Sequence, residues 1–143
     1  MQGIILPDVP FEEKEEFDTV CAEHGLDFVS LIAPTSHERI TMIAKEASGF
    51  LYCVSSLGVT GTRSKITTDI GAMVELVRKA NPELPAAIGF GISDAQTAAQ
   101  MAEKADGVIV GSAIVKLIAA HGEDAVPYVK DFVSELKNAI RNI

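Results

Sequence analysis

The sequence predicts an α/β fold built on a parallel sheet, and three observations support this prediction. Five short apolar runs alternate along the 143 residues with segments whose apolar residues recur at helical spacing. The runs are continuously apolar, as is typical of parallel strands that need cover on both faces. Two of them end in glycine directly before a helix start, at Gly89 and at Gly111.

The length and composition are those of a single globular domain, which we expect to span residues 1–143. Apolar residues make up 48% of the chain, which excludes intrinsic disorder, and the longest apolar runs are too short to cross a bilayer. The net charge of -8 argues against a nucleic-acid or anionic-membrane surface. It leaves a phosphate ligand open, because backbone amides can hold phosphate without a basic patch.

The N-terminus and the cysteines predict a cytoplasmic setting. Residues Met1–Asp8 contain no basic segment and so do not form a secretory signal. Cys21 and Cys53 are poor evidence for a disulfide scaffold, and both are expected to be reduced and structural. No cluster of cysteine, histidine and acidic residues has metal-ligand spacing, so neither a metal nor a cofactor is expected.

The first half of the chain is expected to form two strand–helix units. The first strand, Gly3–Leu6, is broken by a proline, and the helix Glu12–Glu23 begins with acidic residues that suit the helix dipole. The second strand, Phe28–Ile32, precedes a helix with an N-cap at Thr35 or Ser36 and a glycine stop.

The second half is expected to form three more units around a long loop. After the third strand, Phe50–Val54, the polar segment Ser55–Lys65 is longer than most strand-to-helix loops, and long loops are often lids or binding loops. The remaining expected elements are a helix over 68–79, a strand over 85–89, a helix capped by Ser93 or Asp94, a strand over 107–110, a short helix to about 120 and a helix over 123–142. The last helix has apolar residues at intervals suited to one buried face.

Five parallel strands leave two architectures open. A (β/α)8 barrel needs eight strands and typically about 250 residues, so the chain is either an open sheet or a piece of a larger barrel. Two glycine-ended turns in succession favour the last two units of a phosphate-binding barrel. At the second of them, Gly111–Ser112, the first amides of the next helix are expected to point outward at an anion.

Four motifs at successive or near-successive strand ends carry a resemblance to a known family. They are Leu6–Pro10, Val54–Gly61, Gly89–Ser93 and Gly111–Lys116. In this order and spacing they resemble the second half of the tryptophan synthase alpha subunit family, from its fourth barrel strand to its C-terminal helix. The resemblance implies a partial TIM (β/α)8 barrel of about five parallel strands with flanking helices. It also implies a lyase that cleaves indole-3-glycerol phosphate to indole and glyceraldehyde 3-phosphate.

The resemblance assigns binding roles to seven residues. It implies phosphate contacts at Gly61, Gly91, Gly111 and Ser112, loop closure at Thr60, and pocket walls at Tyr52 and Phe90. Asp8 is expected to order the site and subunit communication and not to act as the base. Ser56 stands where many family members carry an arginine, so a closure supported by that arginine is not expected.

The family's catalytic glutamate and aspartate lie on early strands that have no counterpart in this chain. We therefore assign no catalytic residue and expect the chain to be inactive alone. The expected ligands are indole-3-glycerol phosphate or glyceraldehyde 3-phosphate, and the expected partner is the tryptophan synthase beta subunit. The free edge of the first strand, beside an incomplete apolar interior, also predicts self-association.

Two other functions stay open. One is another phosphate-binding barrel enzyme, such as a relative of ribulose-phosphate epimerase or thiamine-phosphate synthase. Those families also end with Gly-Ser turns, but they lack the Gly-Val-Thr-Gly lid present at 58–61. The other is a non-catalytic half-barrel that serves as a folding or interaction module.

Overall fold

The computed structural model describes residues 1–55, 63–89, 91–141 and 143, with the backbone alone at 35, 37 and 63–69. Within these residues six short strands run parallel to their neighbours. The strands are β1 (Gly3–Ile4), β2 (Asp27–Phe28), β3 (Leu31–Ile32), β4 (Leu51–Val54), β5 (Ala86–Gly89) and β6 (Gly107–Ile109). The predicted α/β fold with parallel strands is confirmed.

The second expected strand is divided between two partners. Its first part, β2, pairs with β1, and its second part, β3, pairs with β4. The amide of Val29 donates to the carbonyl of Ile4 at 2.9 Å, and the amide of Tyr52 donates to the carbonyl of Ser30 at 3.0 Å. A single strand over Phe28–Ile32 is therefore wrong, because each half of the segment bonds to a different neighbour.

The helices follow the expected segments, with shifts at their starts. They are α1 (Glu15–Glu23), α2 (His37–Glu46), α3 (Arg63–Ala80), α4 (Ala95–Ala102), α5 (Ser112–His121) and α6 (Ala125–Arg141), with 3-10 turns η1 (Phe11–Glu13), η2 (Pro34–Ser36) and η3 (Gly122–Asp124). The helix expected from Thr68 begins at Arg63, because residues 63–67 contain no glycine or proline to delay it. The loop after β4 is correspondingly shorter than expected. The first and last helices begin late, because η1 and η3 precede them.

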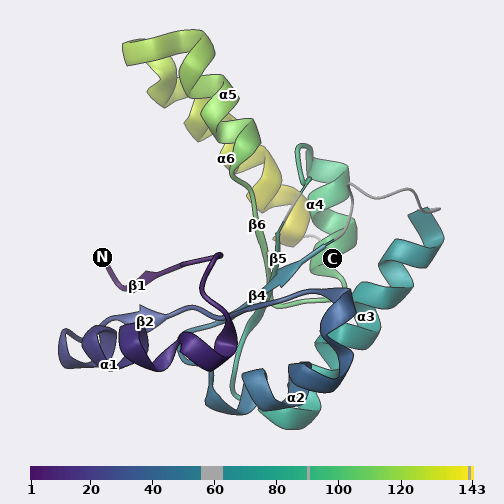
Figure 1. Cartoon of the computed structure of the whole chain (residues 1–143). Coiled ribbons are helices and arrows are strands. Elements are labelled where there is room, and N and C mark those ends of the chain that lie inside the picture. Colours follow the sequence, from purple (N-terminus) through teal and green to yellow (C-terminus); the bar gives the residue numbers. More distant parts are fainter. Residues whose placement is uncertain (56–62, 90, 142) are drawn as a thin grey trace.

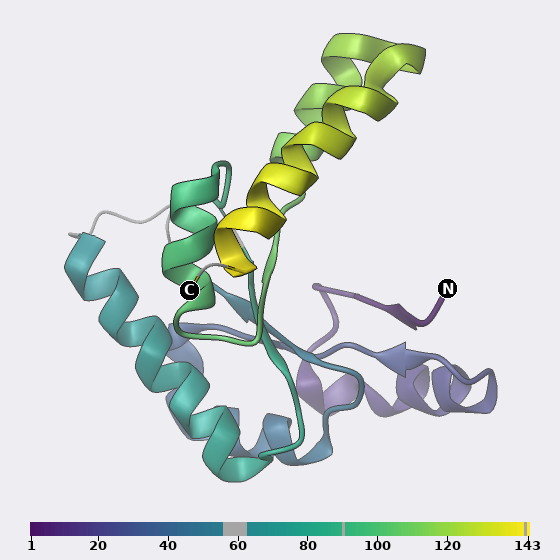
Figure 2. The same cartoon turned by 180° about the vertical axis from the view of Figure 1, so that it is seen from behind.

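One face of the sheet carries the hydrophobic core. Along β4, Leu51 and Cys53 are fully buried, whereas Tyr52 and Val54 are half-buried. Helices α2 and α3 pack together over the buried face, as Figures 1 and 2 show from opposite sides. The core includes Ile40, Ala44, Ile70, Val74, Val77, Ile88 and Ala98. Among the described residues the other face of β4, which carries Tyr52 and Val54, is the less covered one.

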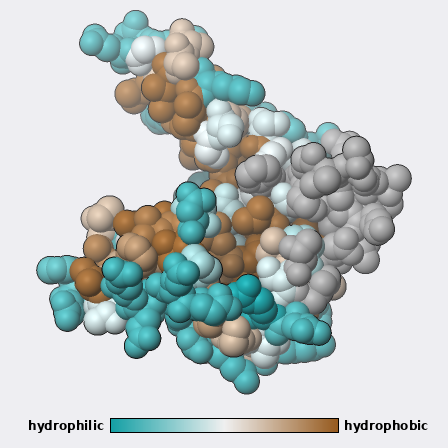
Figure 3. Space-filling view, viewed as in Figure 1, coloured by the Kyte–Doolittle hydropathy of each residue, from teal (hydrophilic) through white to brown (hydrophobic). Residues whose placement is uncertain are grey.

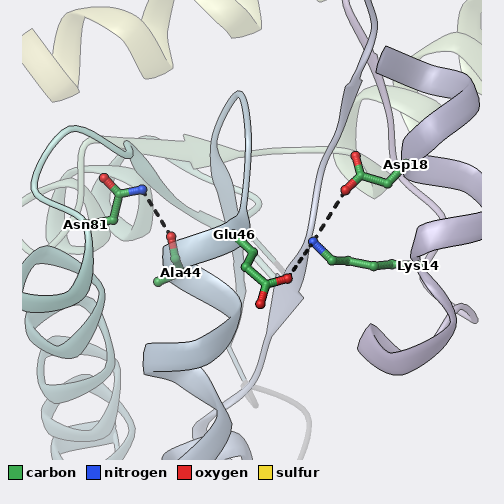
Figure 4. Close-up of polar contacts among 5 residues, drawn as sticks. All are labelled: Lys14, Asp18, Ala44, Glu46 and Asn81. Atoms are coloured by element: carbon green, nitrogen blue, oxygen red, sulfur yellow. Dashed lines mark hydrogen bonds and ion pairs between the residues drawn. The ribbon is translucent and has the colours of Figure 1, made fainter. Parts of the chain in front are cut away.

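Polar contacts fasten the helices to this core (Figure 4). The ammonium of Lys14 pairs with Asp18 at 3.4 Å and with Glu46 at 3.3 Å, so α1 is tied to α2. The side-chain amide of Asn81 donates to the carbonyl of Ala44 at 3.1 Å, which satisfies a carbonyl in the last turn of α2. The bonds from Lys14 to Glu46 and from Asn81 to Ala44 each join residues that the sequence separates by more than 30 positions.

Helices α5 and α6 form a paired arm that projects away from the sheet (Figures 1 and 2). At its tip the rings of His121 and Tyr128 are stacked, with centroids 3.5 Å apart. At its base α6 packs against α4, and Leu136 is buried there. The face of α6 expected to be buried is covered only in part, because the first half extends beyond the sheet and packs against α5, where Val126 and Tyr128 stay exposed.

The arm therefore exposes apolar side chains. Val126 is 74% exposed and Val115 is 63% exposed. In Figure 3 apolar surface covers part of the arm and also lies across the hollow from it, over the part that carries β1 and α1. No helix in the described part of the chain is long and apolar enough to span a membrane.

Candidate functional site

A cavity of about 880 Å³ lies where the sheet meets the base of the arm. Side chains and backbone from the ends of β4 and β6, from the turn after β5 and from both arm helices border it. The lining residues are Tyr52, Gly91, Ile92, Ser93, Ile109, Gly111, Ser112, Ala113, Lys116, Leu117 and Phe132. The carboxyl ends of parallel strands meet at one edge of a sheet, which is where α/β proteins build their sites.

The helix that opens onto this cavity has no side-chain cap of its own. Gly111 is the N-cap residue of α5, and its carbonyl accepts the first intrahelical bond from the amide of Val115 at 3.0 Å. Glycine has no side-chain oxygen, so it cannot accept hydrogen bonds from the amides of Ala113 and Ile114, as the side chain of an N-cap residue normally would. The first turn of α5 is thus suited to receive an anion from the cavity.

The preceding strand-to-helix turn is built differently. There the carboxylate of Asp94 accepts hydrogen bonds from the amide of Thr97 at 2.8 Å and from its hydroxyl at 2.9 Å. Asp94 is the N-cap of α4, which confirms one of the two expected caps. Because a carboxylate already occupies this helix start, a second anion at the same amides would be repelled. The two glycine-ended turns are therefore not equivalent.

Gly91 lies in the first of these turns, between β5 and α4, and lines the cavity. Its φ is +76°, in the left-handed region that favours glycine, so the chain turns sharply here without strain. The expectation that a side chain at this position would obstruct close approach is consistent with its place at the wall.

Tyr52 lines the cavity, and its ring lies against a glycine of the neighbouring strand. A Cβ atom built on Gly89 would overlap the phenol ring of Tyr52, so the ring lies directly over the backbone of β5. Burial raises the pKa of the Tyr52 hydroxyl, so it is a neutral donor or acceptor at ordinary pH. Ser55, buried beside it, fixes the strand ends, because its amide and its hydroxyl both donate to the carbonyl of Gly89 at 3.0 Å.

The buried thiol nearby is not a nucleophile. Burial, and secondarily the charge of Asp106, raise the pKa of Cys53 to about 12. The thiol therefore stays protonated at neutral pH and packs in the core. Both cysteines are free and buried, in agreement with the expected reduced, structural role.

The structure brings together four of the seven expected binding residues. Tyr52, Gly91, Gly111 and Ser112 line one cavity. Thr60, Gly61 and Phe90 lie outside the described residues, and so does Ser56. Asp8 is exposed in the turn after β1 and does not line this cavity.

The sequence interpretation missed two features of the site. Gly89 was predicted only as a strand end, and its contact with the ring of Tyr52 was not anticipated. Lys116, Leu117 and Phe132 were not considered as lining. Helical spacing could have identified the first two, because Lys116 lies four positions after Ser112 and Leu117 four positions after Ala113.

Comparisons with known proteins agree on one family. The family model described as "Tryptophan synthase alpha chain" matches residues 1–141. The tryptophan synthase alpha chain of Halalkalibacterium halodurans is 46% identical over 145 residues, which cover 95% of this chain and 54% of that protein. The alpha chain of Lactiplantibacillus plantarum is 48% identical over 139 residues, with 96% and 52% covered.

Solved structures show the same relation. Tryptophan synthase subunit alpha from Campylobacter jejuni matches with a TM-score of 0.84 and 31% identity, over 95% of this chain and 54% of that chain. The subunit from Legionella pneumophila str. Paris matches with a TM-score of 0.79 and 38% identity, over 99% and 53%. The chain spans about half the length of the relatives that it matches. Its fold is that of about half a TIM barrel.

Replacing Gly89 by alanine is predicted to displace the ring of Tyr52. Because the added Cβ overlaps the phenol, the free energy of unfolding should fall by about 1 to 3 kcal/mol in urea titrations. The pKa of Tyr52 should fall toward its ordinary value as the ring moves to solvent. Tyrosinate absorbance against pH measures this pKa, with Tyr52→Phe to assign the signal.

Gly107→Ala is the matched control. A Cβ there would meet only Ala87, at an ordinary 3.9 Å, so stability and the titration of Tyr52 should change little. An equal effect of the two substitutions would contradict the assigned role of Gly89.

Proposed function

The chain belongs to the tryptophan synthase alpha chain family, and from this premise we propose that it carries the phosphate-holding part of a lyase. The proposed reaction of the complete enzyme cleaves indole-3-glycerol phosphate to indole and glyceraldehyde 3-phosphate. The observation that carries the proposal is the uncapped first turn of α5, which opens into the cavity beside Gly91 and Tyr52.

In the proposed binding mode, the phosphate and the organic part of the ligand contact two different sides of the cavity. Backbone amides at Gly91, Gly111 and Ser112 hold the phosphate, with the hydroxyl of Ser112 as a further donor. Tyr52 faces the organic part of the ligand from the strand side. Thr60 and Gly61 are proposed to close over the phosphate, and Phe90 to add to the pocket wall.

The chemistry of cleavage is proposed to depend on carboxylates outside this site. Proton transfer to indole C3 and from the glycerol hydroxyl needs positioned acids and bases. None of the described residues that line the cavity is Asp or Glu. We therefore propose that the chain alone binds the phosphate but does not cleave the ligand.

Partners follow from the same premise. The tryptophan synthase beta subunit is the proposed partner of the complete enzyme.

The proposed cellular location is the cytoplasm. The free, buried cysteines Cys21 and Cys53 support this location. Residues 1–143 are proposed to act as a single domain.

We propose that a second copy of the chain covers the unpaired strand edges of the sheet. Within the described residues β1 and β6 each pair along one edge only. A twofold axis parallel to the strands would place β1 of one copy beside β6 of the other in the parallel sense. It would also bring α1, with Val20 52% exposed, next to the apolar arm of the partner copy. One arrangement thus covers both apolar surfaces.

Gly111→Asp is predicted to separate stability from binding. An aspartate at this N-cap would bond to the amides of α5 as Asp94 does for α4, so stability should hold or rise by a few tenths of a kcal/mol. The affinity for glycerol phosphate should fall by about tenfold or more, because the carboxylate occupies and repels the anion site. Calorimetric titration measures the affinity.

The control for added charge is Asn138→Asp, an exposed position on α6 away from the cavity. It should bind glycerol phosphate as the unchanged chain does. If Gly111→Asp binds equally well, the phosphate is not held at this helix start. Equal affinity of the unchanged chain for glycerol phosphate and indole-3-glycerol phosphate would indicate a phosphate site without an indole pocket.

The purified chain is predicted to release no indole from indole-3-glycerol phosphate. The chain should be expressed in a host whose own tryptophan synthase genes are deleted, so that contamination cannot supply indole. Indole above the level of a sample without protein would refute the proposed inactivity.

Light scattering over a concentration series is predicted to show a dimer at micromolar concentration. Val126→Glu should shift the chain toward monomer, because a charge would replace the most exposed apolar side chain of the arm. Asn138→Glu, on the same helix, should leave the dimer intact. A monomer at every concentration would count against the second copy.

A further inference from the structure

Lys116 is the charged side chain among the described residues that line the cavity. It shares one side of α5 with Ser112, Ala113 and Leu117, all of which border the same space. Phe132 of α6 lies on the cavity as well. Lys116 therefore faces the proposed binding site.

The geometry of a helix carries this lysine toward the open first turn. A rise of 1.5 Å per residue puts the Cα of Lys116 roughly 6 Å from that of Ser112 along the axis. Long side chains on a helix lean toward its N-terminus, over the preceding turn. The flexible four-carbon stem of lysine can therefore bring its ammonium to the side of the amides that point into the cavity.

No carboxylate of the described residues lies within ion-pair distance of Lys116. The ion pairs of the described residues hold other cations, namely Lys14, Arg39, Arg78 and Lys79. The cavity thus has one cation in its described wall and no acidic side chain there. This gives a local positive site on a chain whose net charge is -8.

We propose that Lys116 is the cation that neutralises the phosphate held at the start of α5. This inference rests on the proposed function, because it concerns the same ligand. A phosphate monoester carries between one and two negative charges near neutral pH. The backbone amides orient the phosphate, and the ammonium supplies a full positive charge that the partial charges of a helix end do not.

The experiment is a calorimetric titration of the full chain and three variants with glycerol 3-phosphate. Lys116→Gln should weaken binding about fivefold, the loss expected when one exposed ion pair is removed. Lys116→Arg should stay within about twofold of the unchanged chain, because the charge is kept. Lys130→Gln removes a charge from an exposed position on α6 outside the cavity and should bind as the unchanged chain does. Thermal melts check that each variant is folded.

The outcomes separate this inference from the proposed function. If the unchanged chain binds glycerol 3-phosphate and Lys116→Gln binds it equally well, the role of Lys116 is refuted and the phosphate site stands. If Lys130→Gln weakens binding as much as Lys116→Gln, net charge and not position explains the loss, and the inference is again refuted. If the unchanged chain does not bind the probe, both the inference and the proposed function fail.

Discussion

The packing of α2, α3 and α4 against one face of β4 and β5 is the constraint on which the rest of the molecule depends. Leu51, Cys53 and Ile88 point into that layer and are fully buried. Because successive side chains of a strand alternate in direction, the same register turns Tyr52 to the other face, where it lies over Gly89. A shift of one residue would both expose the core and remove Tyr52 from the cavity wall. Stability and site therefore depend on one alignment.

The cavity gains its chemical character from a difference between two similar turns. At α4 the chain closes its own helix start with Asp94, and the amide of Thr97 is bonded internally. At α5 the N-cap is Gly111, and the amides of the first turn face the cavity instead. The difference costs the fold a capping interaction, which is typically worth a few tenths of a kcal/mol relative to a glycine cap.

The local elements could be predicted from the sequence because they depend on local signals. Continuous apolar runs identified the strand regions, and the cap at Asp94 follows from its side chain. The division of the second strand could not be predicted, since it depends on which neighbour each half meets. The exposure of Val126 and Tyr128 in the first half of α6 was also missed. The periodicity of this helix indicates an apolar face but not whether another element reaches it, and Val126 stays exposed. Within the site, the glycine turns could be predicted from the sequence. The contact between Gly89 and Tyr52 could not, because it depends on the register between two strands.

The arm formed by α5 and α6 combines two surfaces that respond to ionic strength in opposite directions. Its apolar side chains, such as Val115 and Val126, would meet another copy of a chain that carries a net charge of -8. Dissolved salt screens the repulsion between two such copies and so favours their contact. The same salt weakens the attraction between the ammonium of Lys116 and a phosphate. Under the two proposals, low ionic strength would therefore both keep the chain dispersed and strengthen the attraction of the cavity for an anion.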